Sequence, residues 1–164
     1  MTTTVTPLPA PSWLRELSTA RATYEELLGW PVSIQVSTRD LVAVVGGTLG
    51  AVGMPARLGA QVRQELGFAM LCGPIVADPG GTFWTFLTRP VGAPRSDVAE
   101  DLDAVRVHIA ARGDRVEIPC DTRGFRIGGW RWVERPVPNR PLPPGFAVVS
   151  IVRRLTYDAG DMAA

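Results

Sequence analysis

The stretch DPGGTFWTFLTRP, which runs from Asp78 to Pro90, predicts a turn followed by a strand at the middle of a sheet. Its first four residues favour a turn, because Asp can bond its own backbone, Pro fixes φ and Gly accepts a positive φ. Residues 82–88 interleave aromatic side chains with threonines, which is typical of a strand. Ile75 and Val76 precede the turn and predict the partner strand of a hairpin. We expect this hairpin to be central and packed.

The composition is that of a single folded domain. The chain has 164 residues, of which 46% are hydrophobic and 20% are charged. This balance supports a sizeable core and excludes an intrinsically disordered chain. We predict one domain over residues 12–156, between disordered tails at residues 1–11 and 157–164. The predicted class is α+β, with a central, mostly antiparallel β-sheet flanked by about four helices.

Hydrophobic periodicity assigns helices and strands along the chain. Helices are expected to start near residues 12, 55, 96 and 146, with Ser12 and Ser96 as N-caps. The first helix is expected to end at Gly29 and the last near residue 155. Strands are expected at residues 32–36, 41–45, 49–54, 69–77, 82–88, 115–118 and 128–133. Residues 105–110 fit both a helix and a strand, since Val105 and Ile109 satisfy either period.

Charge is balanced over the whole chain but not along it. The net charge is +1, so no global field draws the protein to nucleic acid or to a membrane. Residues 1–105 hold 7 arginines and 10 acidic residues, whereas residues 106–164 hold 10 arginines and 6 acidic residues. Every basic residue is arginine, whose planar fork suits phosphate, although a coding bias gives the same composition. The second half therefore carries a mild basic bias.

The sequence predicts a cytoplasmic protein without a membrane partner. No apolar run approaches the length of a membrane-spanning helix. The N-terminal residues lack the basic and apolar regions of a signal peptide. Cys72 and Cys120 show neither a metal-binding nor a disulfide pattern, which indicates a reducing compartment.

Motifs that carry chemistry are missing. The sequence contains no phosphate-binding glycine loop, no dinucleotide fingerprint, no zinc-protease helix and no nucleophile elbow. His108 is the only histidine, and its spacing suggests no serine or cysteine partner. The residues therefore predict no catalytic group, no metal site and no cofactor.

Arginines and tryptophans of the second half supply the candidate binding residues. The segment from Phe125 to Trp132 interleaves aromatic side chains with arginines, a combination that holds single-stranded nucleic acid. The phosphate-binding candidates are Arg106, Arg112, Arg115, Arg123, Arg126 and Arg131, and the stacking candidates are Trp130 and Trp132. In the alternative interpretation, which the alternation favours, the two tryptophans share one strand face and pack on the core.

Four stretches, taken in order, resemble the primase/polymerase domain of the archaeo-eukaryotic primase superfamily, most closely its short actinobacterial members. Residues 22–32, ATYEELLGWPV, resemble its opening helix and GWPV corner. Residues 53–66, GMPARLGAQVRQEL, are similar to a helix of the short relatives. Residues 79–86, PGGTFWTF, resemble the strand in which a Gly-Gly pair precedes a histidine. Residues 113–132, GDRVEIPCDTRGFRIGGWRW, resemble a later strand and turn. The resemblance implies the family's α+β fold over most of the chain.

The resemblance also implies a metal-dependent nucleotidyltransferase site, whose ligands this sequence lacks. In the family, an Asp-x-Asp pair, a histidine and a third aspartate hold two divalent metals that clamp the attacking and leaving oxygens. These positions fall at Ala51, Gly53, Phe83 and near His108. Ala, Gly and Phe side chains carry no metal-ligating atom. The family's cysteine-rich insert is also absent.

Three functional hypotheses follow. The first is a catalytically inactive primase/polymerase-like domain that binds single-stranded nucleic acid or a nucleotide through the arginines of its second half. The alternative is a protein-interaction or regulatory module that keeps the fold without a nucleic-acid role. The third is an active nucleotidyltransferase in which Asp40 or Asp78 replaces the lost acids.

Overall fold

The structure, a computed structural model, describes residues 9–120 and 129–161. Within them the helices are α1 (Ser12–Leu28), α2 (Ala56–Phe68), α3 (Ser96–Ala104) and α4 (Gly145–Asp161). The strands are β1 (Val32–Gln35), β2 (Asp40–Val44), β3 (Gly50–Pro55), β4 (Ile75–Ala77), β5 (Phe83–Thr88), β6 (His108–Ile109), β7 (Arg115–Ile118) and β8 (Arg131–Glu134). The predicted α+β class is confirmed. None of the described helices is long and apolar enough to cross a membrane.

The strands form two antiparallel sheets, where the sequence predicted one. The three-stranded sheet has the order β1-β2-β7, and the five-stranded sheet has the order β6-β3-β5-β4-β8. Strand β5 lies at the centre of the larger sheet, between β3 and β4, as expected. The turn before β5 is closed by the Gly81 N–H, which donates to the Asp78 carbonyl at 2.9 Å, and Gly81 has φ 69.

Two of the connections between the sheets are neighbours in space. One leads from β2 to β3 and the other from β6 to β7. They are bonded to each other, since the Val45 N–H donates to the Asp114 carbonyl at 2.9 Å and the Gly113 N–H donates to the Val45 carbonyl at 2.8 Å. Gly46 and Gly47 interrupt the first connection, and Gly113, with φ 94, interrupts the second. Glycines therefore stand in both connections, between the end of a strand of one sheet and the start of a strand of the other.

The five-stranded sheet is buried on both faces, which explains its nearly continuous apolar strands. Ala51 of β3 packs in a cluster with α1 and the three-stranded sheet, whereas its neighbour Val52 packs in a second cluster with α2 and α4. In β5, Leu87 packs in the first of these clusters and its neighbour Phe86 packs in the second. All four side chains are at most 1% exposed. One sheet therefore separates two apolar cores.

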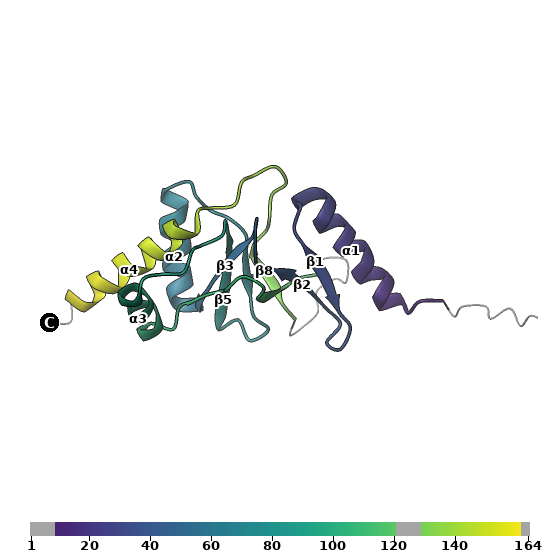
Figure 1. Cartoon of the computed structure of the whole chain (residues 1–164), viewed down its shortest axis with the longest axis horizontal. Helices are drawn as coiled ribbons and strands as arrows, with labels where there is room; N and C mark the ends of the chain where they lie inside the picture. The colour runs from purple at the N-terminus through teal and green to yellow at the C-terminus, as the bar shows by residue number, and fades with distance from the viewer. Residues whose placement is uncertain (1–8, 121–128, 162–164) are drawn as a thin grey trace, which may run out of the picture.

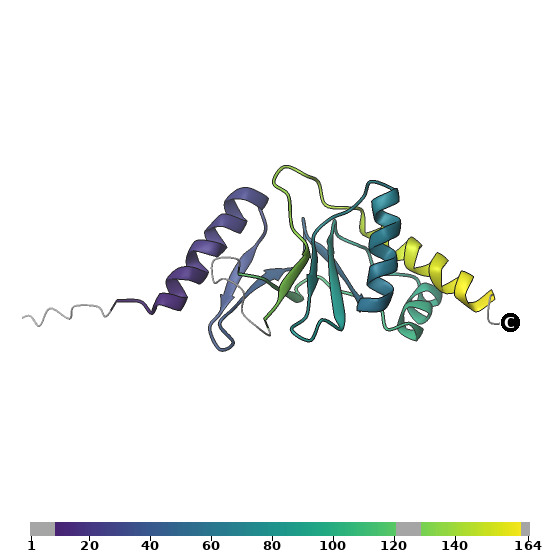
Figure 2. The same cartoon turned by 180° about the vertical axis from the view of Figure 1, so that it is seen from behind.

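The helices occupy the two ends of an elongated molecule, as Figure 1 shows. α1 packs on β1 and β2 at one end, and α2, α3 and α4 gather at the other. Seen from behind in Figure 2, the connection from β8 to α4 arches over the sheet between the end of α1 and α2. Residues 135–144 consequently lie near elements of both cores.

The structure resolves the ambiguous residues 105–110. Helix α3 ends at Ala104, Arg106 adopts φ 59, and His108–Ile109 pair with β3 as a short strand. The positive φ at Arg106 cannot continue a helix, so the alternation of valine and isoleucine describes this segment better than the helical period.

Some element ends differ from the sequence prediction. Helix α4 continues to Asp161, past residue 155 and into residues predicted as a disordered tail. Gly29 ends α1 with φ 65, as predicted. Ser12 and Ser96, predicted as N-caps, are instead the first helical residues and make no capping hydrogen bond, because a proline and an arginine with extended φ/ψ precede them.

Candidate functional site

A shallow hollow of about 270 Å³ lies on one face of β3, β5 and β6; we call it the β3 hollow. Residues directly opposite each other in an antiparallel pair share a face, and Gly53 pairs with both Thr85 and His108. Ala51 and Phe83 lie two positions along their strands and so belong to the same face. The four positions at which the resemblance places metal ligands therefore line one hollow.

Phe83 occupies the space above Gly53. A Cβ atom built on Gly53 would lie 2.6 Å from Phe83 Cε1, so the ring rests directly on the glycine. The Phe83 N–H donates to Asp78 Oδ1 at 2.9 Å, and the Thr82 hydroxyl donates to Asp78 Oδ2 at 3.2 Å. The carboxylate of Asp78 thus holds the turn that positions Phe83.

The pKa of Asp78 reflects this role. Burial raises the pKa, but hydrogen bonds from Phe83, Thr82 and Gly81 favour the charged carboxylate more strongly and bring the pKa below its ordinary value of 3.8. Both oxygens of Asp78 are engaged by the turn. Asp78 is therefore a structural carboxylate.

The charges around the β3 hollow are mixed. Arg115, Asp114 and Glu117 line it together with His108. Asp114 Oδ2 lies 4.0 Å from His108 Nε2 and accepts the Ala111 N–H at 2.8 Å. The His108 side chain is 74% exposed, so its pairing with Asp114 is screened by water.

The residues of the β3 hollow do not fit the two-metal centre that the resemblance implies. Ala51, Gly53 and Phe83 offer no oxygen or nitrogen ligand from their side chains, and divalent metals of this class need several carboxylate oxygens. Within residues 9–120 and 129–161, no group of three or more histidine, cysteine or acidic side chains is placed to hold a metal.

The predicted phosphate-binding arginines are not gathered in one patch. Arg115 lines the β3 hollow, and Arg112 lines a cavity of about 430 Å³ beside it. His108 lines both, so the two arginines lie in adjoining cavities. Arg106 is exposed just before β6. Arg131 belongs to β8, the opposite edge of the sheet, where its guanidinium lies against Gly81. Arg123 and Arg126 lie outside the described residues.

The predicted stacking residues take part in packing. Trp130 and Trp132 are half-buried against the cluster of α1 and the three-stranded sheet. The centroid of the Trp132 ring lies 6.3 Å from that of Tyr24 and 6.4 Å from that of Trp30. The Trp132 Nε1–H donates to the Tyr24 hydroxyl at 3.3 Å. This placement agrees with the core interpretation of the alternating tryptophans.

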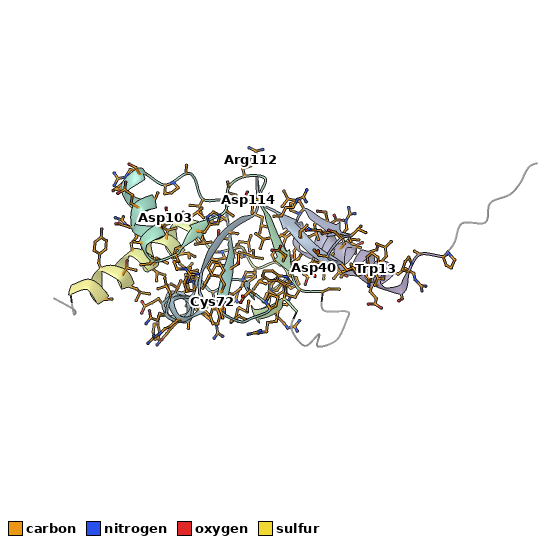
Figure 3. All side chains as sticks on the ribbon, turned by 90° about the horizontal axis from the view of Figure 1, so that it is seen from below. Trp13, Asp40, Cys72, Asp103, Arg112 and Asp114 are labelled. Carbon is orange, nitrogen blue, oxygen red and sulfur yellow. The ribbon has the colours of Figure 1, made fainter. Side chains whose placement is uncertain are left out.

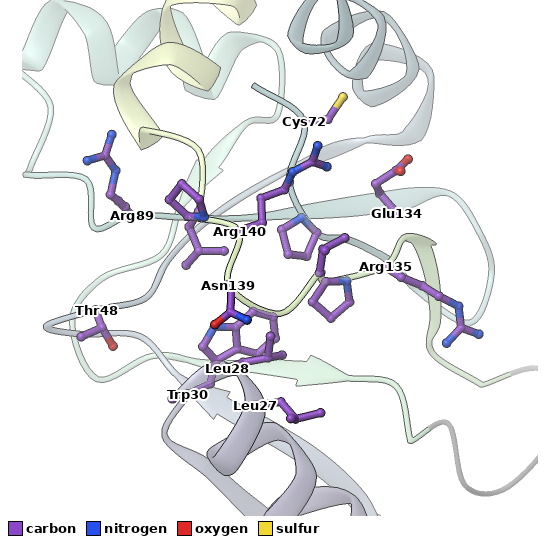
Figure 4. A pocket seen from close by; sticks show the side chains of 17 residues that line it. Leu27, Leu28, Trp30, Thr48, Cys72, Arg89, Glu134, Arg135, Asn139 and Arg140 are labelled. Atoms are coloured by element: carbon purple, nitrogen blue, oxygen red, sulfur yellow. The ribbon is translucent and has the colours of Figure 1, made fainter. Parts of the chain in front are cut away.

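A larger pocket, of about 610 Å³, lies beneath the connection from β8 to α4. Figure 4 shows Arg140 and Asn139 near its middle, with Arg89 and Arg135 toward opposite sides. We call it the arginine pocket. In Figure 3, Cys72, one of its lining residues, lies on the opposite side of the molecule from Arg112 and Asp114. The two sites therefore face different directions.

The sequence did not indicate the arginine pocket. Its residues come from five separate segments, namely 27–30, 48, 72–74, 89 and 134–142, which only the fold brings together. The one local signal was the pair Arg135 and Arg140 around a proline-rich stretch that the sequence predicted as a loop.

Comparisons with protein-family models, with curated proteins and with solved structures found no match for this chain.

Proposed function

We propose that this protein is a catalytically inactive primase/polymerase-like domain that binds single-stranded nucleic acid in the cytoplasm. The observation that carries the proposal is that Ala51, Gly53, Phe83 and His108, from three different strands, line one hollow. The resemblance requires these positions to converge, whereas a chance match of short motifs does not. The cytoplasmic assignment rests on the absence of a disulfide pattern around the two cysteines.

Loss of catalysis follows from the side chains in the β3 hollow. Phe83 stands at the histidine position and covers Gly53, which stands at an aspartate position. Without carboxylates the family's metal-assisted transfer has no support at this place. We therefore expect no primer synthesis or extension with Mg²⁺ or Mn²⁺.

Binding is assigned to the exposed arginines beside the hollow. Arg112 and Arg115 border adjoining cavities, and Arg106 is exposed on the segment that leads into them. Asp103, Asp114 and other acids nearby reduce the local positive charge, so we expect weak binding with a clear salt dependence.

The experiment is fluorescence anisotropy with a labelled single-stranded oligonucleotide at several salt concentrations. We expect binding at low salt, and a double variant Arg112→Ala/Arg115→Ala that lowers the slope of log K against log salt by about 1.4, the value for two lost contacts to a single strand. Arg57→Ala is the control, since Arg57 is exposed on α2 and its substitution removes a positive charge away from the hollow. Absence of binding at low salt would show the proposal to be wrong.

A ligand graft tests the resemblance itself. The triple variant Ala51→Asp/Gly53→Asp/Phe83→His restores the family's side chains, and replacement of Phe83 removes the ring that a Cβ on Gly53 would meet. We expect this variant to bind Mn²⁺ in a titration, provided that circular dichroism shows it folded. A folded variant that binds no more Mn²⁺ than the parent protein would count against the resemblance.

A second function, docking of a protein partner, is favoured by exposed apolar side chains at the end of α2. Phe68 is 75% exposed, and Met70, in the following turn, is 90% exposed. Exposed apolar groups of this size are enriched at interaction sites. With a second copy of the chain as the partner, this function predicts an assembly that the parent protein forms and Phe68→Ser/Met70→Ser does not, as native mass spectrometry of the two purified proteins can measure.

A further inference from the structure

Two cationic side chains of the arginine pocket have no partner among the described residues. Within the described part of the chain, the guanidinium groups of Arg89 and Arg140 are exposed and have no hydrogen-bond or ion-pair partner. Arg135 lines the same pocket. The charges of Arg89 and Arg140 are therefore not neutralised by any described side chain.

The acidic side chain of the arginine pocket is already engaged. Glu134 lines the pocket, but its Oε2 accepts two hydrogen bonds from Arg63, at 3.0 Å from Nε and 2.8 Å from Nη2. Arg63 does not line the pocket. The charge of Glu134 is thus directed away from Arg89 and Arg140, which leaves an excess of positive charge for an anion.

The remaining walls are apolar and firmly held. Leu28, Trp30 and Leu142 line the pocket. The Trp30 ring stacks on Tyr24 with centroids 6.0 Å apart and planes within 5°. The Tyr24 hydroxyl in turn donates to the Pro119 carbonyl at 2.6 Å. The apolar wall is therefore preorganised, which lowers the entropy cost of binding.

Size and charge point to one class of ligand. A volume of about 610 Å³ is that of a site for a small molecule rather than for a folded partner. The unpaired guanidinium groups of Arg89 and Arg140 at one cavity complement a group with more than one negative charge. A phosphate monoester has this charge and accepts bidentate bonds from guanidinium, whereas a monocarboxylate carries a single charge.

We propose that the arginine pocket binds a small organic phosphate. The phosphate contacts Arg140 near the middle of the pocket, and Arg89 at one side adds to the positive potential (Figure 4). The apolar or aromatic body rests on Leu28, Trp30 and Leu142. This assignment goes beyond the proposed nucleic-acid function and does not depend on it, because Arg112 and Arg115 are not part of this pocket.

Isothermal titration calorimetry with four probes tests the proposal. We expect phenyl phosphate and adenosine 5′-monophosphate to bind, and phenylacetate and adenosine to bind at least about tenfold more weakly, because each lacks the doubly charged group. Arg140→Ala should weaken phosphate binding at least about tenfold, and Arg89→Ala should weaken it by a smaller factor. Arg57→Ala should leave it unchanged. Amide chemical shifts of Gly73, Asn139 and Arg140 should move on titration.

The outcomes are decisive in both directions. No binding of either phosphate ester up to about 5 mM, equal affinity for phenylacetate, or unchanged affinity in both arginine variants would overturn the proposal. Loss of phosphate binding in Arg112→Ala/Arg115→Ala alone would overturn it as well, by moving the site to the β3 hollow. Retention of oligonucleotide binding by Arg140→Ala, together with loss of phenyl phosphate binding, would support two separate sites.

Discussion

The β3 hollow and the arginine pocket differ in the side chains that line their inner surfaces. In the hollow, Phe83 packs on Gly53, and Asp114 lies beside His108. In the pocket, Arg89 and Arg140 have no such partners among the described residues, and the apolar wall is held by the stacked rings of Tyr24 and Trp30. A hollow covered by an aromatic ring contributes to stability, and a cavity with an unpaired guanidinium near its middle has the capacity to bind an anion. The resemblance directs attention to the first, whereas the geometry favours the second as the site of a small ligand.

The two sites also differ in the chain segments that form them. The arginine pocket is assembled from both cores and depends on close contacts between distant segments. The β3 hollow is formed by neighbouring strands of one sheet. Substitutions at the pocket should therefore cost more stability than equivalent substitutions at the hollow.

The largest effect is expected from Gly73→Ala at the pocket. A Cβ atom on Gly73 would lie 2.7 Å from Pro143 Cγ and closer still to Cδ, and the buried proline ring cannot rotate away. We expect a loss of about 3 kcal/mol in the free energy of unfolding, at the upper end for overpacking, measured by urea denaturation. Gly67→Ala is the control, because its nearest neighbour lies 3.8 Å away, and it should be neutral or slightly stabilising. Equal effects of the two substitutions would contradict the close contact.

Tyr24→Phe should follow, with a loss of about 2 kcal/mol. It removes a buried hydroxyl that donates to the Pro119 carbonyl at 2.6 Å and accepts the Trp132 Nε1–H at 3.3 Å, and so leaves both groups without this partner. Tyr157→Phe is the matched control, since the Tyr157 side chain is 61% exposed and water replaces its bonds. Thermal or urea unfolding of the two variants measures the difference, and a smaller effect at Tyr24 than at Tyr157 would be inconsistent with a buried hydrogen bond.

Asp78→Ala should cost about 1 kcal/mol at pH 7, because it removes the acceptor for the Phe83 N–H and the Thr82 hydroxyl at an accessible turn. The lowered pKa of Asp78 fixes the sign of the pH dependence. Its contribution is complete above the ordinary pKa of 3.8 and is lost as the pH falls through the still lower pKa of the folded state. The stability difference between parent and variant should therefore shrink at acidic pH, and a difference that grows there would reverse the assigned shift.

Gly53→Ala should have the smallest effect, a loss of about 0.5 kcal/mol. The new Cβ meets the ring of Phe83, which is half-buried and can move, and the lower entropy of the unfolded chain offsets part of the strain. In a Phe83→Ala background the same substitution should become stabilising by about 0.5 kcal/mol. A double-mutant cycle measures this change of sign. The absence of any coupling would mean that Phe83 does not cover Gly53.

Local patterns in the sequence predicted much of the secondary structure. The turn at Asp78–Gly81 and the aromatic strand after it gave the central strand β5 correctly, and Gly29 ends α1 as expected. Alternation correctly suggested that Trp132 packs inward. The ends of α3 and α4 were less predictable, because either period fitted residues 105–110 and because no breaker follows residue 155 before Gly160.

The sequence by itself determined the α+β class, the hairpin around Asp78–Gly81 and the absence of metal-ligating side chains at Ala51, Gly53 and Phe83, since these depend on residue type and short-range periodicity. Only the tertiary structure decided that the strands divide into two sheets, because no short-range pattern says which strands pair with each other, such as β2 with the distant β7. It also decided which charges are left unpaired. Arg89 and Arg140 look like any other arginines in the sequence, and only the approach of five separate segments places them around one cavity.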